Sequence, residues 1–205
     1  MSASIHSLQG QQRGVTLVEL MIVLVIVAIV AMVAAPAFQD TIQRNQRLSA
    51  VENMGAMIAN ARTEAVSRAT DIALCPSADG ATCSGTANWE DGVILFEDNG
   101  EGSGVARDGI LNGDEELIRV FGAAGGDLQV RSNTNFVNRQ AILFDTRGAV
   151  FDSGTITVCN EPGATNTMAL IINRSGQARL AVDEDATPDD IVNDDGDPPQ
   201  NVGSC

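Results

Sequence analysis

Glu19 is the residue whose position most clearly asks for a chemical explanation. It lies directly before residues 20–35, a run without a polar side chain, and its neighbours on both sides are apolar. A carboxylate inside a membrane segment costs on the order of a few kcal/mol. Position alone leaves two explanations open. Either Glu19 snorkels to the interface near the start of a helix, or it pairs with a positive charge from a neighbouring chain.

Side chains that could perform catalysis are scarce. The only histidine is His6, all 12 basic residues are arginine, and tyrosine is absent. A Ser-His-Asp or Cys-His set requires a histidine, and a Schiff base requires a lysine. The glycines at 100, 102 and 104 do not fit the dinucleotide fingerprint G-x-G-x-x-G. We therefore expect a protein that is not an enzyme and that uses no cofactor.

The four cysteines are spaced as disulfides rather than as a metal site. None forms a C-x-x-C pair, so a zinc site would need all four thiolates at irregular spacing. Four cysteines allow three pairings. We predict the local pair Cys75–Cys83, and the pair Cys159–Cys205, which would tether the tail. In an oxidising periplasm each would add about 2–4 kcal/mol.

An acidic, glycine-rich segment at 97–116 raises the question of calcium. Its oxygen ligands do not have EF-hand spacing, because the third position counted from Asp108 is Ile110 and the twelfth is Arg119. A looser calcium site stays open, and the alternative is an acidic hairpin loop. We assign no metal-binding residue.

Negative charge is concentrated at the C-terminal end. The chain has 27 acidic residues against 12 basic ones, for a net charge of −15. Residues 183–199 hold eight of the acids and no basic residue. Such a composition is typical of a solvated, partly flexible segment. We expect an acidic tail at 183–205, tethered by the disulfide at Cys205.

Two kinds of helical pattern follow each other before residue 71. Residues 15–38 are long and apolar enough for a transmembrane helix, which needs about 20 residues. Pro36 should kink or loosen this helix. Residues 39–70 predict an amphipathic half of the same helix, which lies under a soluble domain. Small residues on its face should let a sheet approach closely: Ala56, Ala59, Ala61 and Ala65. Apolar residues recur there at mostly helical spacing: Ile42, Leu48, Val51, Met54, Ile58, Ala61 and Ala65.

From residue 71 the pattern changes to short strands separated by turns. The predicted strands are 72–75, 92–98, 116–121, 127–132, 141–145, 155–160, 168–173 and 178–182. Asn-Gly, Arg-Gly and Ser-Gly pairs lie between several of them. Strands without intervening helices imply an antiparallel sheet. The fold class is therefore α+β, with a long N-terminal helical spine packed under an antiparallel β-rich head at 71–182.

The N-terminal end resembles the start of a type IV pilin or pseudopilin. A polar leader, 1–14, ends in Gly14 and is followed by Val-Thr-Leu-Val-Glu-Leu and the apolar helix. The resemblance implies that a prepilin peptidase cuts between Gly14 and Val15 and methylates Val15. It also implies that Glu19, the fifth residue of the mature chain, meets the N-terminal amine of an adjacent subunit during assembly. The family usually has Phe where this chain has Val15, and Val keeps the position apolar.

The head is similar to the minor pilins and pseudopilins of the FimT, FimU and GspH group. The matching stretches are 74–100, 108–120 and 157–180, together with a terminal cysteine. The paired cysteines and the step Trp89-x-x-Gly92 favour the pilus members, and a GspH-type minor pseudopilin of type II secretion is the alternative. Either implies a subunit near the filament tip that helps to start assembly.

The resemblance also implies a location and partners. The expected location is the bacterial inner membrane, crossed once, with the head in the periplasm, and afterwards the pilus or pseudopilus. The expected partners are other minor and major pilins or pseudopilins, the prepilin peptidase and the inner-membrane assembly machinery.

DNA uptake is a third functional alternative. Some members of the FimT group are implicated in it through a Gly-Arg-x-Arg stretch near the C-terminal hairpin. The matching residues here are Gly176, Gln177, Ala178 and Arg179, so the first arginine is missing. DNA affinity comes largely from neutralising phosphates, which a chain this acidic opposes. Arg174 and Arg179 are candidate weak contacts, and we expect no tight binding to nucleic acid.

Overall fold

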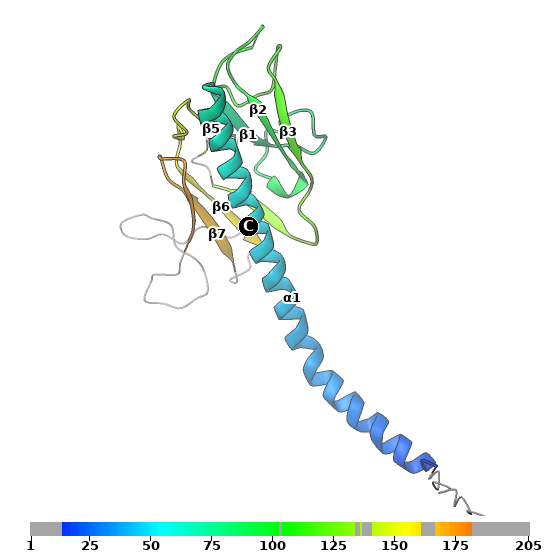
Figure 1. The fold of residues 1–205 in the computed structure, drawn as a ribbon. Coiled ribbons are helices and arrows are strands. Elements are labelled where there is room, and N and C mark those ends of the chain that lie inside the picture. Colours follow the sequence, from blue (N-terminus) through cyan, green and yellow to red (C-terminus); the bar gives the residue numbers. More distant parts are fainter. Residues whose placement is uncertain (1–13, 103, 134–135, 137–140, 161–166, 182–205) are drawn as a thin grey trace, which may run out of the picture. The chain divides into compact units, whose positions relative to one another are not determined.

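The structure is a computed structural model that describes residues 14–102, 104–133, 136, 141–160 and 167–181 (Figure 1). Within the long helix, the side chains of residues 33 and 35–37 are not described. Most of the predicted leader and the whole predicted tail, 183–205, lie outside the described residues. The chain divides into two compact units, Met1–Ile42 and Gln43–Cys205, and the boundary falls inside the helix.

The first unit contains the beginning of helix α1 (Leu17–Arg68). Its side chains from residue 14 to residue 32 are all exposed. No helix in the described part of the chain is long and apolar enough to cross a membrane. The predicted membrane segment at 15–38 includes the four helical positions whose side chains are not described, Pro36 among them. The membrane segment and the kink at Pro36 therefore stay predictions.

In the second unit, α1 buries one stripe of side chains, as the apolar periodicity predicts from Val51 onward. Ile42 and Leu48, which the same periodicity includes, are exposed. The buried residues are Val51, Met54, Ile58, Ala61 and Ala65. Ala56 and Ala59 are exposed, so the prediction that they would face the sheet is wrong. At 3.6 residues per turn these two alanines lie well round the helix from the buried stripe, on its open flank.

Charge and backbone conformation both mark the end of α1. The guanidinium of Arg68 donates hydrogen bonds to the carboxylates of Glu64 (2.8 Å), Glu97 (3.0 Å) and Glu116 (3.3 Å). A positive charge in the last turn is also favoured by the helix dipole. Ala69 follows with φ of 54°, the left-handed conformation that commonly ends a helix.

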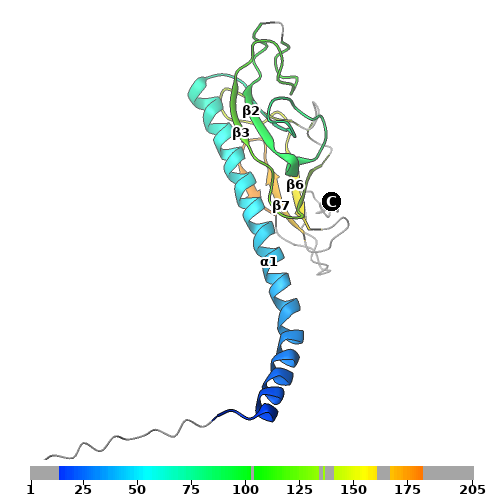
Figure 2. The ribbon, with the colours of Figure 1, turned by 90° about the vertical axis from the view of Figure 1, so that its right-hand side faces the viewer.

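In the described part of the chain, eight strands follow and form two antiparallel sheets (Figure 1, Figure 2). The first sheet has the order β3-β2-β1-β5, and its strands are β1 (Ile72–Pro76), β2 (Val93–Glu97), β3 (Leu117–Phe121) and β5 (Ile142–Phe144). The second has the order β4-β6-β7-β8, and its strands are β4 (Gln129–Ser132), β6 (Gly154–Cys159), β7 (Met168–Ile172) and β8 (Ala178–Leu180). Each strand overlaps one of the predicted segments, and the predicted fold class is confirmed.

The core lies between the two sheets and the buried stripe of α1. Residues that alternate along the strands point into it, for example Leu74 and Leu95 in the first sheet and Ile156 and Ile172 in the second. Together with the helical stripe they form one apolar cluster. The helix is thus part of the core of the head, and burial of this common apolar surface holds both sheets to it.

A short 3-10 turn, η1 (Trp89–Asp91), lies between β1 and β2 in the chain and contacts β4 of the second sheet. Trp89 is 2% exposed and belongs to the core cluster. The carboxylate of Glu90 accepts hydrogen bonds from the backbone N–H of Val130 (3.1 Å) and from the guanidinium of Arg131, both on β4. Gly92 has φ of 129°, and a Cβ there would lie 2.7 Å from the carbonyl oxygen of Ser77. Close packing of this turn against β1 explains why a glycine follows Trp89 at that spacing.

Candidate assembly and interaction sites

The N-terminal turn of α1 makes the threonine half of a capping box. The hydroxyl of Thr16 accepts the backbone N–H of Glu19 at 3.2 Å, and the carbonyl of Thr16 accepts that of Leu20 at 3.2 Å. Threonine followed three residues later by glutamate is the usual signature of this motif. A negative charge in the first turn is also favoured by the helix dipole. Glu19 therefore has a local role in starting the helix, while its side chain stays exposed.

Gly14 and Val15 precede the helix in an open segment. Val15 is 70% exposed. A Cβ added at Gly14 would meet no atom within 4 Å. Neither packing nor backbone conformation in the described chain therefore requires a glycine at this position. The predicted processing of the bond between Gly14 and Val15 stays a prediction, in an accessible stretch.

The predicted local disulfide is confirmed. Cys75 on β1 and Cys83 are bonded, with their Cα atoms 5.7 Å apart. Inside the closed loop, the carboxylate of Asp79 accepts the backbone N–H groups of Ala81 and Thr82, both at 2.8 Å. These bonds hold the pKa of Asp79 well below its usual range. Covalent and polar contacts thus fix the conformation of this loop.

Cys159 occupies the last position of β6 and is fully buried. It is also disulfide-bonded. Its predicted partner, Cys205, lies outside the described residues. The pair Cys159–Cys205 therefore stays a prediction, consistent with the bonded state of Cys159.

The acidic segment at 97–116 folds around a fully buried carboxylate, Asp98. This carboxylate accepts the backbone N–H groups of Arg107 (2.5 Å), Asp108 (3.3 Å) and Gly109 (2.9 Å). Burial raises its pKa to about 6, against the opposing effect of these hydrogen bonds. Asp98 is therefore the anchor of a turn, a role that its place directly after β2 did not reveal.

A second carboxylate organises the other side of the same segment. Glu115 is 8% exposed and accepts the backbone N–H groups of Gly100 (3.0 Å) and Asn112 (3.0 Å). Within the described residues, no three His, Cys, Asp or Glu side chains are grouped so that they could hold a metal ion. Asp98 and Glu115 thus serve as acceptors for the backbone of their own segment, which favours the explanation as a structured acidic loop.

The acidic loop also covers the outer face of the first sheet. Leu111 packs against a second apolar cluster there, which includes Phe96 and Leu143. Arg107 donates a hydrogen bond to Asp71 at 2.6 Å and lies over the ring of Phe151, 4.9 Å from its centroid. The hydrogen bond with Asp71 raises the pKa of Arg107. These contacts give the loop a structural function.

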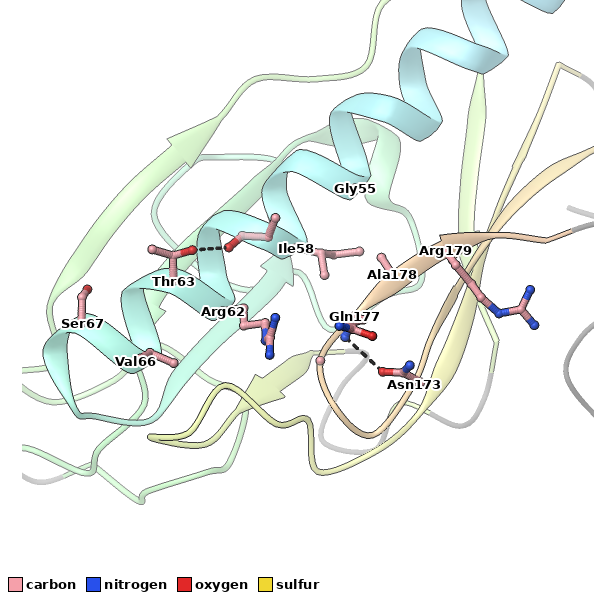
Figure 3. Close-up of a pocket in the computed structure, with 12 residues that line it drawn as sticks. Gly55, Ile58, Arg62, Thr63, Val66, Ser67, Asn173, Gln177, Ala178 and Arg179 are labelled. Carbon is pink, nitrogen blue, oxygen red and sulfur yellow. Dashed lines mark hydrogen bonds between the residues drawn. The ribbon is translucent and has the colours of Figure 1, made fainter.

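The candidate DNA contacts lie near the turn between β7 and β8. In that turn Asn173 Oδ1 accepts the backbone N–H of Gln177 at 3.1 Å (Figure 3). Gly176 has φ of 75°, and a Cβ there would lie 2.1 Å from the carbonyl oxygen of Gly148. The tight approach to Gly148 accounts for this glycine without any role in binding. Arg174 is exposed in the turn, and Arg179 lies on β8.

A groove of about 670 Å³ separates α1 from this turn and β8 (Figure 3). We call it the α1–β8 groove. It is lined by Gly55, Ile58, Ala59, Arg62, Thr63, Val66, Ser67, Asn173, Gly176, Gln177, Ala178 and Arg179. Arg179 is among the lining residues, and Arg174 is not, so the structure does not bring the two candidate DNA contacts into one site. Sequence patterns did not predict the groove, because its walls come from segments more than a hundred residues apart.

The fold is similar to that of a known minor pilin. The crystal structure of the type IV minor pilin FimU from Pseudomonas aeruginosa superimposes with a TM-score of 0.51 at 20% identity, covering 71% of this chain and 95% of that one. The minor pseudopilin EpsH from the type 2 secretion system of Vibrio cholerae gives a TM-score of 0.43 at 12% identity, covering 68% and 99%. No curated protein sequence matches the chain.

A capped N-terminal helix, two antiparallel sheets packed on it and a local disulfide define a pilin-like protein. The profile described as "Prokaryotic N-terminal methylation motif" matches residues 10–35, and that described as "Type II transport protein GspH" matches residues 50–176. The chain belongs to the GspH family of minor pilins and pseudopilins. The recognition made from the sequence is thereby confirmed. This family consists of structural subunits that assemble with other pilins.

Proposed function

We propose that this chain is a minor type IV pilin that lies near the filament tip or primes filament assembly. The observation that carries the proposal is the presence of two family signatures on one chain, the methylation motif at 10–35 and the GspH-family head at 50–176. The Cys75–Cys83 loop and the packed step from Trp89 to Gly92 support the pilus assignment. The chain then acts as a building block and not as a catalyst.

A minor pseudopilin of type II secretion is the second candidate. The description of the matching family names that transport system. Both kinds of subunit share the helix and the β-rich head, so the fold supports either. The distinction rests on the filament into which the chain is incorporated.

Maturation is the first step of the proposed function. A prepilin peptidase cuts between Gly14 and Val15 and methylates the new N-terminus at Val15. The exposure of Val15 and the open space round Gly14 support access to this bond. Because no packing requires Gly14, the requirement for glycine comes from the enzyme that reads the leader. The residues that follow insert into the inner membrane as a single span.

Glu19 acts in the second step, which is assembly. Cleavage creates a positive amine on Val15, four residues before Glu19 in the sequence. The hydrogen bond to the Thr16 hydroxyl uses only the backbone N–H of Glu19, so the carboxylate stays available. In an apolar helical bundle, the amine of a neighbouring subunit and this carboxylate attract each other far more strongly than in water. The pair selects the axial position at which a new subunit joins.

The head remains in the periplasm until the subunit enters the filament. Disulfides persist in that oxidising compartment, and the Cys75–Cys83 bond supports this location. The partners of the head are other minor and major pilins, brought together by the inner-membrane assembly machinery.

The test is deletion of the gene, with complementation by the full chain. We expect loss or strong reduction of surface pili, normal type II secretion, and this chain in the sheared pilus fraction by immunoblot. Intact piliation together with a loss of secretion would reject the pilus assignment and establish the pseudopilin alternative. Intact piliation and secretion would reject both.

A further inference from the structure

The α1–β8 groove has a charge that is unusual for this chain. Acids outnumber arginines by 27 to 12 over the whole sequence. Yet the residues that line the groove include two arginines, Arg62 and Arg179, and no carboxylate. Its α1 wall is otherwise apolar or weakly polar, with Ile58 and Val66 among its side chains. The groove therefore suits an acidic segment that also carries apolar residues.

Arg62 is the charge that faces the groove most directly. Its side chain points from α1 toward the turn of Asn173 and Gln177 (Figure 3). Among the described residues, its one hydrogen bond runs from Nε to the carbonyl oxygen of Gly148 at 3.2 Å. The two terminal nitrogens of Arg62 are strong donors that this bond leaves unused. A carboxylate arriving in the groove would complete the coordination of the guanidinium.

The second wall offers the edge of a sheet. β8 is the last strand of the order β4-β6-β7-β8, so among the described residues no strand pairs with the other side of its backbone. Such an edge pairs readily with an extended segment. The β8 residues Ala178 and Arg179 line the groove, so a segment entering there would lie beside this edge.

The chain itself carries a segment of matching chemistry directly after β8. Described structure ends at residue 181, and 24 residues follow it. In this tail the apolar pair Ile191 and Val192 is flanked by Asp189 and Asp190 on one side and by Asp194 on the other. Extended chain spans roughly 3.3 Å per residue, so even a short reverse turn after β8 returns this pair to the groove. No basic residue in the tail opposes its approach.

We propose that residues 188–194 of the chain's own tail dock in the α1–β8 groove, with the apolar pair against the α1 wall and the flanking acids at Arg62. The tail adds to the open edge of β8 and neutralises the local positive charge.

The test is hydrogen exchange of the full chain in detergent micelles, read at the amides of β8 and of residues 55–67. In a variant with Ile191→Ser, Val192→Ser, Asp189→Asn and Asp190→Asn, β8 amides should exchange about tenfold faster, as expected for a lost local contact. A control with Asp197→Asn and Val202→Ser keeps the length and Cys205, and should exchange as the wild type does.

A charge exchange makes the test specific for Arg62. Arg62→Glu alone should speed exchange at β8, and combining it with Asp189→Arg and Asp190→Arg should restore the slow exchange. Arg119→Gln removes an exposed arginine from β3 in the other sheet and should have no effect. Unchanged exchange in the tail variant would overturn the proposal. So would protection that depends on protein concentration, because the occupant would then be a second copy.

Discussion

The two ends of α1 differ in how far their apolar side chains are buried. Between residues 15 and 32 the large apolar side chains are 53% to 80% exposed. Between residues 51 and 65 the apolar side chains of the core stripe are 0% to 4% exposed. The first segment is apolar on every side, whereas the second alternates apolar and charged residues with helical period.

This difference separates the two tasks of a filament subunit. The later segment finds its partners within its own head, so its sequence is governed by packing against two sheets. The earlier segment has apolar side chains on all sides of the helix, and in the described chain those from residue 15 to residue 32 are exposed. Lipid before assembly and neighbouring helices afterwards are the environments that suit such a surface. Assembly and head stability should therefore respond to different substitutions.

The largest effect is expected for Glu19→Ala. In the proposed assembly step Glu19 pairs with the amine of a neighbouring subunit, and removing one member of such a buried pair leaves the other uncompensated, at about 3–5 kcal/mol. Leader cleavage and membrane insertion should be retained, and incorporation into sheared filaments should fall more than tenfold by immunoblot. Glu19→Gln is the matched control, because it keeps the size and loses the charge, and it should share the defect. Normal incorporation of the Ala variant would reject the assembly role proposed for the Glu19 carboxylate.

A matched pair of isoleucines tests the comparison between the two segments directly. Ile58→Ala removes a side chain that is 1% exposed in the core, and should lower the free energy of unfolding of the head by about 2–5 kcal/mol. Ile22→Ala removes the same atoms where the side chain is 55% exposed, and should change head stability by less than about 0.5 kcal/mol. Urea titration of the full chain in detergent, followed by Trp89 fluorescence, measures both. Equal losses would show that the two segments are stabilised together.

Loss of the confirmed disulfide should affect the head alone. The bond closes a loop with a sequence separation of 8 residues. Its removal in the double variant Cys75→Ser, Cys83→Ser should cost about 2.5 kcal/mol in the chain-entropy account. The melting temperature of the head should fall, while cleavage after Gly14 stays normal by intact mass. An unchanged melting temperature would show that the hydrogen bonds of Asp79 alone hold the loop.

The smallest effect concerns pH. The pKa of Asp98 is raised to about 6 in the folded chain. The folded state binds this proton more tightly than the unfolded state, so the free energy of unfolding should rise as pH falls from 7 to 5. This contribution of Asp98 to stability is lost as pH increases through 6. The gain should be about 1 kcal/mol, and Asp98→Asn should remove it. If wild type and variant keep the same pH dependence by urea titration, another group is responsible.

Local patterns in the sequence determined a large part of this structure. Alternation and turn pairs are set by residues close in sequence, so all eight strands lie where the pattern predicts them. Cys75 and Cys83 are near enough in sequence for their pairing to follow from spacing. The recurrence from Val51 to Ala65 located the buried stripe of α1, because helical period is likewise local. The pilin-like start was readable for the same reason.

Only the tertiary structure decided which strands share a sheet and what the polar residues do. β5 pairs with β1 in the first sheet, although three strands separate them in the sequence. β4 pairs with β6 in the second sheet and not with its sequence neighbour β3. Such pairings depend on packing between distant segments, which no local period encodes. The same reason explains why Ala59 lines a groove rather than the core, and why Asp98 holds a turn. A side chain's role there is set by the backbone groups that folding brings to it, and these come from elsewhere in the chain.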